Sequence, residues 1–321
     1  MANFLIRRLV QAIPLLVVIS LLTFLIVEIA PGDAAQMYID PDHGTDPEYI
    51  EQVRLSLGLE QPVYVRYFAW LMRTVSGDWG FSFRTRRAVS LEVGDRLPNT
   101  VLLSGTALFL SFVLAVPIGV ISALKRYSLI DYALTTLSLV GISVPIFWIA
   151  LLLLQVFAIQ LNWLPASGMR SARVNYQGTQ ATLDILRHMI LPTIVLSLAQ
   201  IASWSRYQRS ALLDVLGQDY VRTARGKGLS ERRVMMHALR NALIPMITLV
   251  GLSLPGVVTG AFLTETIFSW PGLGRLGVDA VNGRDYPVIM AVTMLSAILI
   301  IVGSLVADLA CAWADPRIRY D

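Results

Sequence analysis

Long apolar runs alternate with short polar segments along the whole chain. The first uncharged run extends from Leu9 to Val27, which is long enough for a helix to cross the roughly 30 Å hydrocarbon core of a bilayer. Further apolar runs follow at Thr100–Leu124, Tyr132–Ile159, Met189–Ser205, Asn241–Thr264 and Val288–Ala307. We therefore predict an all-α integral membrane protein with six transmembrane helices.

The first apolar run also invites comparison with a secretory signal peptide. The apolar core of such a peptide usually has about 7 to 15 residues. The run from Leu9 to Val27 is longer, and other apolar runs follow it. We interpret it as an uncleaved first transmembrane helix.

The second and third predicted spans each contain an internal proline, Pro117 and Pro145. Proline removes one backbone hydrogen bond, but a membrane helix tolerates it where neighbouring groups satisfy the freed carbonyl. We expect a kink at each proline. The fourth predicted span, Met189–Ser205, is the shortest and contains Gln200.

The stretch from 31 to 98 is polar enough to lie outside the membrane. Apolar residues at helical spacing predict two short helices in it, Pro47–Leu57 and Val63–Thr74. Their aromatic residues suit interfacial anchors and a small core equally well. We predict three parts: 1–30 with the N-terminus and first span, 31–98 as an extracytoplasmic region with short helices, and 99–321 as a five-helix core.

The composition supports a membrane protein of this kind. Apolar residues make up 55% of the chain, charged residues only 15%, and the mean hydropathy is +0.62. These values exceed what a soluble core needs. The single cysteine, Cys311, cannot form an internal disulfide.

The distribution of positive charge predicts the orientation. If the N-terminus is inside, fourteen of the 26 Lys and Arg residues lie on the inner side, and seven of the others lie in the long 31–98 region. Long regions carry little weight in the positive-inside rule, and without this one the comparison is fourteen against five. We expect both termini to be cytoplasmic, together with the charged segment 206–240.

The charged segment 206–240 reads as two helices separated by a break. Ser210–Ala224 favours a helix despite Gly217, and Gly226-Lys227-Gly228 favours a sharp turn because glycine tolerates left-handed backbone. Ser230 is a plausible N-cap for the second helix. That helix carries one apolar stripe made of Val234, Met235, Ala238, Leu239 and Ala242. From this pattern alone, an ordinary basic loop at lipid headgroups is as good an interpretation as a docking surface for another protein.

The same segment carries a resemblance to a known family. It contains Asp219-Tyr220-Val221-Arg222-Thr223-Ala224-Arg225, then Lys227-Gly228-Leu229-Ser230, then His237-Ala238-Leu239-Arg240-Asn241-Ala242 with Pro245. This pattern resembles the cytoplasmic coupling loop of ATP-binding-cassette (ABC) importer permeases, specifically the dipeptide, oligopeptide and nickel permease family of the dipeptide permease B type.

Other motifs of that family are spread over nearly the whole chain. They are Pro31-Gly32-Asp33, Gly77-Asp78-x-Gly80, Leu97-Pro98-x-Thr100, Leu191-Pro192, Glu265-Thr266-x-Phe268-Ser269-Trp270-Pro271-Gly272-Leu273-Gly274, Arg284-Asp285-Tyr286-Pro287 and Asp315-Pro316-Arg317-Ile318-Arg319. Two positions depart from the family pattern. Gly226 stands where alanine is expected, which would loosen the turn, and Cys311 stands where an aromatic residue is usual.

The resemblance implies a type I ABC importer permease fold in a bacterial cytoplasmic (inner) membrane. It implies four kinds of partner: a second homologous permease subunit, two ATP-binding-cassette ATPase subunits, an extracytoplasmic solute-binding protein, and membrane lipid. ATP and Mg would be used by the ATPase subunits, with no cofactor bound by this chain. The implied contacts to the ATPase are Asp219, Tyr220, Arg222, Thr223, Ala224, Arg225, Gly226, Lys227 and Gly228.

A second candidate site is the turn after the fifth span, where Glu265, Trp270, Pro271 and Gly272 are candidates for an outer gate. The same Trp-Pro-Gly turn could equally be structural. No catalytic, metal-binding or nucleic-acid-binding residues are expected, because the chain has no phosphate-binding loop motif and its three histidines, His43, His188 and His237, are far apart.

Two alternative functions remain open at this point. A secondary transporter would need ionisable residues near several span midplanes, and the spans are almost free of them. A scaffold subunit would not change the ATPase rate when its loop is mutated. The family takes up dipeptides, longer peptides, glutathione, nickel chelates and other small solutes, and the lack of a metal site leans toward peptides.

Overall fold

The structure is a computed structural model that describes residues 2–29, 60–172, 174, 176–259 and 262–314, together with positions 48, 51, 54 and 55. The predicted helix Pro47–Leu57, the Pro31-Gly32-Asp33 motif and the motif at 315–319 lie outside the continuous described ranges. The side chain of Cys311 is likewise outside the description.

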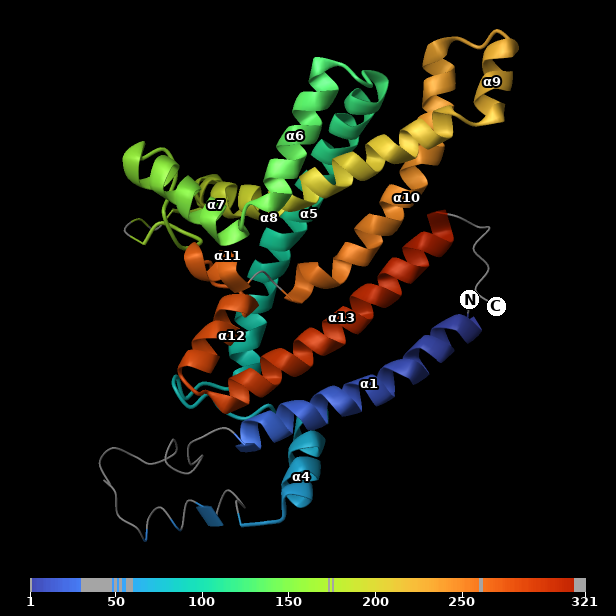
Figure 1. Ribbon diagram of the computed structural model, residues 1–321. Helices are drawn as coiled ribbons and strands as arrows, with labels where there is room; N and C mark the ends of the chain where they lie inside the picture. The colour runs from blue at the N-terminus through green and yellow to red at the C-terminus, as the bar shows by residue number, and fades with distance from the viewer. Residues whose placement is uncertain are drawn as a thin grey trace. The chain divides into compact units, whose positions relative to one another are not determined.

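The described chain is almost entirely helical (Figure 1). Its elements are α1 (Ala2–Ile29), α4 (Val63–Val75), α5 (Val89–Leu124), α6 (Leu129–Ser143), α7 (Ile146–Leu153), the π-helix η2 (Leu154–Gln160), α8 (Thr179–Leu216), α9 (Asp219–Gly226), α10 (Glu231–Thr259), α11 (Phe262–Ile267), α12 (Leu273–Asn282) and α13 (Tyr286–Ala314). The predicted short helix Val63–Thr74 is confirmed as α4.

Five described helices are long and apolar enough to cross a membrane: α1, α5, α8, α10 and α13. A sixth span results if α6 and the stretch Ile146–Gln160 are counted as one. The predicted number of spans therefore agrees with the structure when this broken pair is taken as a single crossing.

The third predicted span is broken rather than kinked. Its two halves, Leu129–Ser143 and Ile146–Gln160, meet at an angle of 101°. Val144 is extended, with φ −84° and ψ 130°, because a residue before proline is pushed out of the helical region. Pro145 thus ends one helix and begins the next, whereas Pro117 lies inside α5 without ending it.

The fourth predicted span was too short. We expected Met189–Ser205, preceded by a loop that reaches His188, but α8 begins at Thr179 and continues to Leu216. The Asp184 carboxylate in its second turn accepts hydrogen bonds from the Ser171 backbone N–H at 2.8 Å and from the Ser171 hydroxyl at 2.7 Å. A residue of the preceding loop therefore provides hydrogen bonds to a polar side chain near the start of α8. The pattern of apolar residues in the sequence cannot reveal these bonds.

The chain divides into two compact units, each described here by itself. The larger contains Pro98–Arg275 and Leu299–Asp321, and the smaller contains Ala2–Leu97 and Leu276–Ile298. In the smaller unit Tyr67 of α4 is buried against Phe24 of α1 and Met290 of α13, and its hydroxyl lies 2.9 Å from the Ser20 hydroxyl. Of the two interpretations of the aromatic residues in α4, the small core is confirmed for Tyr67.

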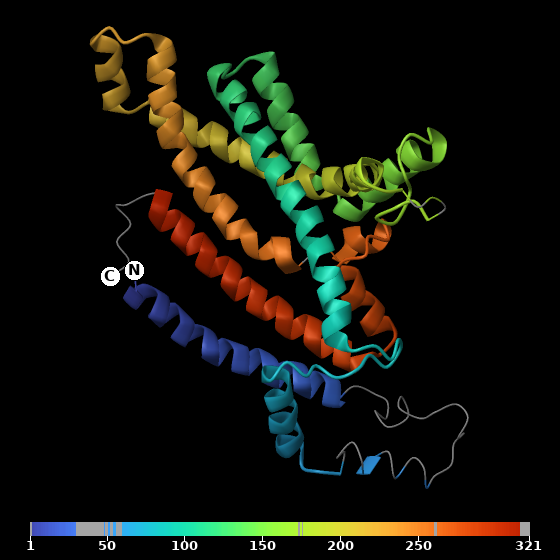
Figure 2. The same cartoon turned by 180° about the vertical axis from the view of Figure 1, so that it is seen from behind.

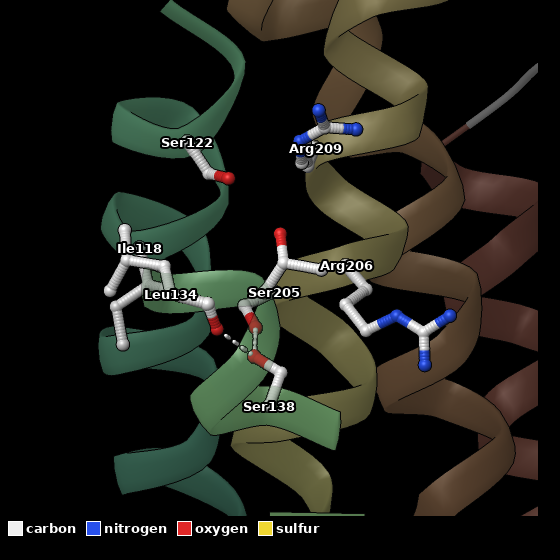
Figure 3. A pocket seen from close by; sticks show the side chains of 8 residues that line it. Ile118, Ser122, Leu134, Ser138, Ser205, Arg206 and Arg209 are labelled. Carbon is white, nitrogen blue, oxygen red and sulfur yellow. Dashed lines mark hydrogen bonds between the residues drawn. The ribbon is translucent and has the colours of Figure 1, made fainter. Parts of the chain in front are cut away.

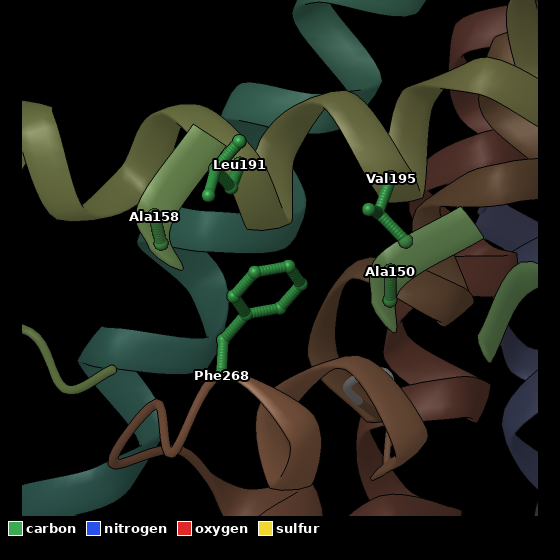
Figure 4. Packing of buried hydrophobic residues seen from close by; sticks show 5 residues of the cluster. All are labelled: Ala150, Ala158, Leu191, Val195 and Phe268. Atoms are coloured by element: carbon green, nitrogen blue, oxygen red, sulfur yellow. The ribbon is translucent and has the colours of Figure 1, made fainter. Parts of the chain in front are cut away.

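The larger unit is held together where α8 crosses its neighbours. In one cluster, Leu191 and Val195 of α8 pack with Ala150 of α7, Ala158 of η2 and Phe268 (Figure 4). A second cluster joins α5, α8 and α10 through Leu108, Ala115, Trp204 and Met246. Seen from behind, α8 runs from the α7 region toward α9 and meets α10 on the way (Figure 2). The helix α8 is thus the central element of this unit.

Candidate functional site: the segment around α9 and the Trp-Pro-Gly turn

The helix α9 is a separate element between α8 and α10 (Figure 1). We expected one continuous helix over Ser210–Ala224, but α8 ends at Leu216 and α9 begins at Asp219. Gly217 closes α8, and Gln218 is extended with ψ 150°. Glycine is a poor helix former in an exposed position, and this break makes α9 an independent short helix.

The predicted break after α9 is confirmed. The helix ends at Gly226, and Gly228 has φ 75°. The Gly228 backbone N–H donates to the Arg225 carbonyl at 2.9 Å, and the Leu229 N–H donates to the Ala224 carbonyl at 3.3 Å. These bonds close the end of the helix around a glycine in the left-handed conformation.

One face of α9 is fastened to α10. Val221 is 1% exposed and Ala224 is half-buried. The Asn241 amide donates to the Tyr220 hydroxyl at 2.7 Å. Arg225 donates to both carboxylate oxygens of Glu231, at 2.9 and 3.3 Å. The two helices are therefore joined by a hydrogen bond and an ion pair, on the same side of α9 as the buried Val221.

The opposite face of α9 is exposed. It consists of Asp219, Arg222, Thr223 and Gly226, at positions i, i+3, i+4 and i+7 of one helix. The side chains of Asp219 and Arg222 are 97% and 75% exposed, and their ion pair is 3.7 Å long. Such an exposed pair contributes little to stability, so both groups can contact another protein.

The start of α10 agrees with its predicted amphipathic pattern. It begins at Glu231, directly after Ser230. The stripe residues Val234, Ala238 and Ala242 are buried, and Met235 and Leu239 are half-buried. In contrast, Arg233, His237 and Arg240 are exposed. The stripe packs with Leu212 of α8 and Ala123 of α5.

The two glycines at the end of α9 predict opposite effects of an alanine substitution. A Cβ at Gly226 meets nothing within 4 Å and its φ is not left-handed, whereas Gly228 has φ 75°. We expect Gly226→Ala to stabilise α9 by about 0.5–1 kcal/mol and Gly228→Ala to destabilise the turn by about 1–2 kcal/mol. Amide hydrogen exchange of residues 219–229 in the two variants measures both effects. Equal protection in both would contradict the proposed difference in backbone conformation.

The second candidate site, the Trp-Pro-Gly turn (residues 265–275), is buried. Glu265 and Trp270 are both 0% exposed. The Thr100 hydroxyl donates to Glu265 Oε1 at 2.8 Å, and the Arg275 backbone N–H donates to Oε2 at 3.0 Å. The Trp270 indole donates to the Asn99 carbonyl at 2.9 Å. These bonds connect the turn to the first residues of the larger unit.

The backbone of the turn lies directly against the Glu265 carboxylate. A Cβ added to Gly272 would lie 2.4 Å from Oε1, and one added to Gly274 would lie 2.9 Å from Oε2. The Asn99 amide donates to the Pro271 carbonyl at 2.9 Å. Glycine at position 272 is therefore required by the close approach of the carboxylate.

The sequence did not assign roles to the partners of these residues. Thr100 belongs to a motif that we recognised without a function, and nothing local predicts its bond to Glu265, because the two are 165 positions apart. The same is true of Asp131 and Arg209, which are 78 positions apart and form an ion pair. From the sequence, Arg209 is only one of the inner positive charges.

Metal binding has no support in the described part of the chain, where no three His, Cys, Asp or Glu side chains are grouped to hold an ion. His188 has a local partner instead, since its Nδ1 lies 2.8 Å from the Asp184 carbonyl oxygen. The expectation that this chain binds no metal or cofactor stays a prediction.

The described chain has five helices, or six with the broken pair, that are long and apolar enough to cross a membrane, as in a multi-pass membrane protein. The fold is similar to a chain of the MetNI methionine ABC transporter, solved in inward-facing conformations, with a TM-score of 0.54 and 16% identity over 70% of this chain and 96% of that one. The fold is that of a type I ABC importer permease.

Sequence comparison shows the family. Residues 115–320 match the binding-protein-dependent transport system inner membrane component family, and residues 1–104 match its N-terminal region. The chain belongs to this family, and it is a membrane-spanning permease subunit of an ABC importer.

Curated relatives match over their full length. The oligopeptide transport system permease protein AppB of Bacillus subtilis (strain 168) is 44% identical over 324 residues, covering 100% of both chains. The di/tripeptide transport system permease protein DppB of Pseudomonas aeruginosa (strain UCBPP-PA14) is 40% identical, covering 100% of this chain and 99% of its own. The glutathione transport system permease protein GsiC of Escherichia coli (strain K12) is 40% identical, covering 100% of both.

Proposed function

We propose that this chain forms half of the translocation pathway of an ATP-driven importer for peptides or similar small solutes, and that α9 couples it to cytoplasmic ATPase subunits. The observation that carries the proposal is the division of α9 into a fastened face and an exposed face. A short helix held in this way moves as a rigid body when a bound partner moves, and it passes that displacement to the helix to which it is fastened. A basic segment that only lies at lipid headgroups needs no such fastening.

The proposed assembly has four kinds of subunit. A second homologous permease would supply the other half of the pathway, because six spans are half of what a two-fold importer needs. Two ATPase subunits would bind ATP and Mg, since this sequence has no phosphate-binding loop motif. An extracytoplasmic solute-binding protein would deliver the substrate. The site of action would be a bacterial inner membrane, with both termini of this chain in the cytoplasm.

The structure suggests distinct roles for the predicted contact residues. Asp219, Arg222 and Thr223 lie on the exposed face and would contact the ATPase, and exposed Lys227 in the following turn would extend this contact. Tyr220 and Arg225 bind α10, and half-buried Ala224 lies on the same side of α9, so these residues would keep α9 in position. Gly228 would allow the tight turn, and Gly226 on the exposed face would allow close approach.

For the Trp-Pro-Gly turn, the contacts favour a fixed anchor over a moving gate. A gate at Glu265, Trp270, Pro271 and Gly272 would have to break several buried hydrogen bonds each time it opened, and buried polar groups left without partners are costly. We propose that the turn holds the segments around it in place, and that a gate at this position is the alternative to be tested.

The names of the relatives guide the choice of substrate. One is named for oligopeptides, one for di- and tripeptides and one for glutathione, which is itself a small peptide-like solute. We propose a peptide of a few residues as the substrate class.

Transport in proteoliposomes tests the proposal. The complete assembly is reconstituted with its ATPase subunits facing the vesicle lumen, which contains ATP, and the binding protein is added outside. We expect these vesicles to accumulate a labelled tripeptide only when ATP is hydrolysed. Uptake driven by an ion gradient without ATP would favour a secondary transporter. Uptake and ATPase rates that do not depend on α9 would favour a scaffold role.

A further inference from the structure

A buried ion pair lies outside the predicted coupling residues. The Asp131 carboxylate at the start of α6 is 3% exposed. Arg209 of α8 donates to both of its oxygens, from Nε and from Nη2, at 2.7 Å each. Bidentate pairs of this kind are strong and fix the relative orientation of their two groups.

The same carboxylate also holds the turn between α5 and α6. It accepts hydrogen bonds from the Ser122 hydroxyl on α5 and from the Tyr127 backbone N–H at 2.9 Å. Tyr127 has φ 64°, a conformation that a non-glycine residue adopts only under constraint. Asp131 therefore links α5, the α5–α6 turn and α8 at one point. Figure 3 shows Ser122 and Arg209 on facing sides of α5 and α8.

The Asp131–Arg209 pair lies close to the C-terminal end of α8, which leads into α9. Arg209 is seven residues before the end of α8 at Leu216, about 10 Å along the helix axis. Beyond it, Leu212 packs with Ala123 of α5 and with Ala238 and Ala242 of α10. Any displacement of α9 and α10 therefore reaches α8 near Arg209.

Around Gly119, small groups form the contact between α5 and α8. A Cβ added to Gly119 of α5 would lie 2.6 Å from the Ser205 carbonyl oxygen, so the two helix backbones touch. Small residues permit close approach, and elsewhere along this contact the Ser111 hydroxyl of α5 makes only a long hydrogen bond, 3.4 Å, to the Ser197 carbonyl of α8. The Asp131–Arg209 pair, together with the bond from the Ser122 hydroxyl to Asp131, supplies a directional link between α5, α6 and α8 here.

We propose that Asp131 and Arg209 are positioning residues that make the α5–α6 turn move together with α8 when α9 is displaced. This inference rests on the proposed coupling function of α9. The pair passes the movement from the ATPase-contacting segment to a second pair of membrane helices, whereas a merely structural pair would maintain the fold without affecting coupling.

The conservative variant Arg209→Lys separates the two roles. Lysine keeps the positive charge beside the carboxylate but cannot form the bidentate hydrogen bonds of a guanidinium. In the complete reconstituted complex, we expect Arg209→Lys to lower the ratio of substrate-stimulated to basal ATPase rate about tenfold, within the usual range of coupling effects, while assembly and basal rate stay normal. Arg206→Lys is the matched control, since it makes the same substitution one turn earlier on α8, where Arg206 extends away from α5 (Figure 3).

A distance measurement reports positioning directly. Spin labels at the exposed positions Lys125→Cys and Asp214→Cys, in a Cys311→Ser background, report the separation between the α5–α6 turn and the end of α8. We expect this separation to be the same with and without ATP when Arg209 is present, and to change between these states in Arg209→Lys. An unchanged separation together with an unchanged ATPase ratio in Arg209→Lys would overturn the inference.

Two further variants make the result unambiguous. If the complex with Arg209→Lys does not assemble, the double variant Asp131→Asn with Arg209→Gln replaces it in the same measurements. If neither variant assembles, the pair has a folding role alone and the inference is overturned. The α9 variant Arg222→Glu serves as a reference. If it uncouples the ATPase and Arg209→Lys does not, only this inference fails, and if neither has an effect, the proposed function of α9 fails as well.

Discussion

Substituting Arg222 with glutamate should reduce substrate-stimulated ATPase activity and peptide uptake by at least about tenfold, a change that corresponds to about 1.4 kcal/mol of coupling energy. The Arg222 side chain is 75% exposed and lies on the exposed face of α9. Reversing a charge at a complementary interface replaces attraction by repulsion and costs several kcal/mol. The fold of this chain should remain intact, because the pair with Asp219 is long and exposed.

The matched control for this experiment is Arg232→Glu. Arg232 is an exposed residue in the first turn of α10 and lies outside the free face of α9. The substitution Arg232→Glu changes the net charge by the same amount in the same segment as Arg222→Glu. A general effect on lipid binding would therefore appear in both variants. Equal loss of activity in both would mean that the segment acts through its total charge, and the docking role of α9 would have to be abandoned.

Substituting Gly272 with alanine should destabilise the protein strongly, and removal of the Glu265 side chain should relieve much of that effect. The added Cβ would lie 2.4–2.5 Å from the Glu265 carboxylate atoms, an overlap that typically costs about 1–3 kcal/mol. Glu265→Ala alone leaves the Thr100 hydroxyl and the Arg275 N–H without their acceptor, at about 1–3 kcal/mol for each buried group.

A double-mutant cycle measures this interaction. The melting midpoints of Gly272→Ala, Glu265→Ala and the double variant are compared with that of the unaltered protein in the same detergent. We expect the double variant to melt well above the value that adding the two single effects would give, because the overlap requires both groups. Additive effects would show that the close contact is absent.

The cycle also distinguishes an anchor from a gate. An anchor predicts that stability and transport fall together in each variant. A gate predicts that a variant which weakens the turn, such as Glu265→Ala, raises the basal ATPase rate or solute leak while the protein still assembles. Leak through a well-assembled complex would favour the gate and overturn the anchor proposal.

The local sequence identified most helices, because burial in lipid requires about 20 apolar residues in a row and leaves a clear pattern. The Gly226-Lys227-Gly228 break and the apolar stripe of α10 were equally readable, since backbone freedom and helical periodicity are local properties. Errors arose where a polar group is satisfied from elsewhere, as at the start of α8, where Ser171 binds Asp184.

The sequence by itself determined the membrane class, the turn between α9 and α10, and the family resemblance, since each depends on residues that are neighbours in the chain. Only the tertiary structure decided the 101° bend after Ser143, the two different faces of α9, and the pairings of Asp131 with Arg209 and of Glu265 with Thr100. Those pairings join residues 78 and 165 positions apart. A single buried carboxylate has no periodicity, and its partner is fixed by how the helices pack.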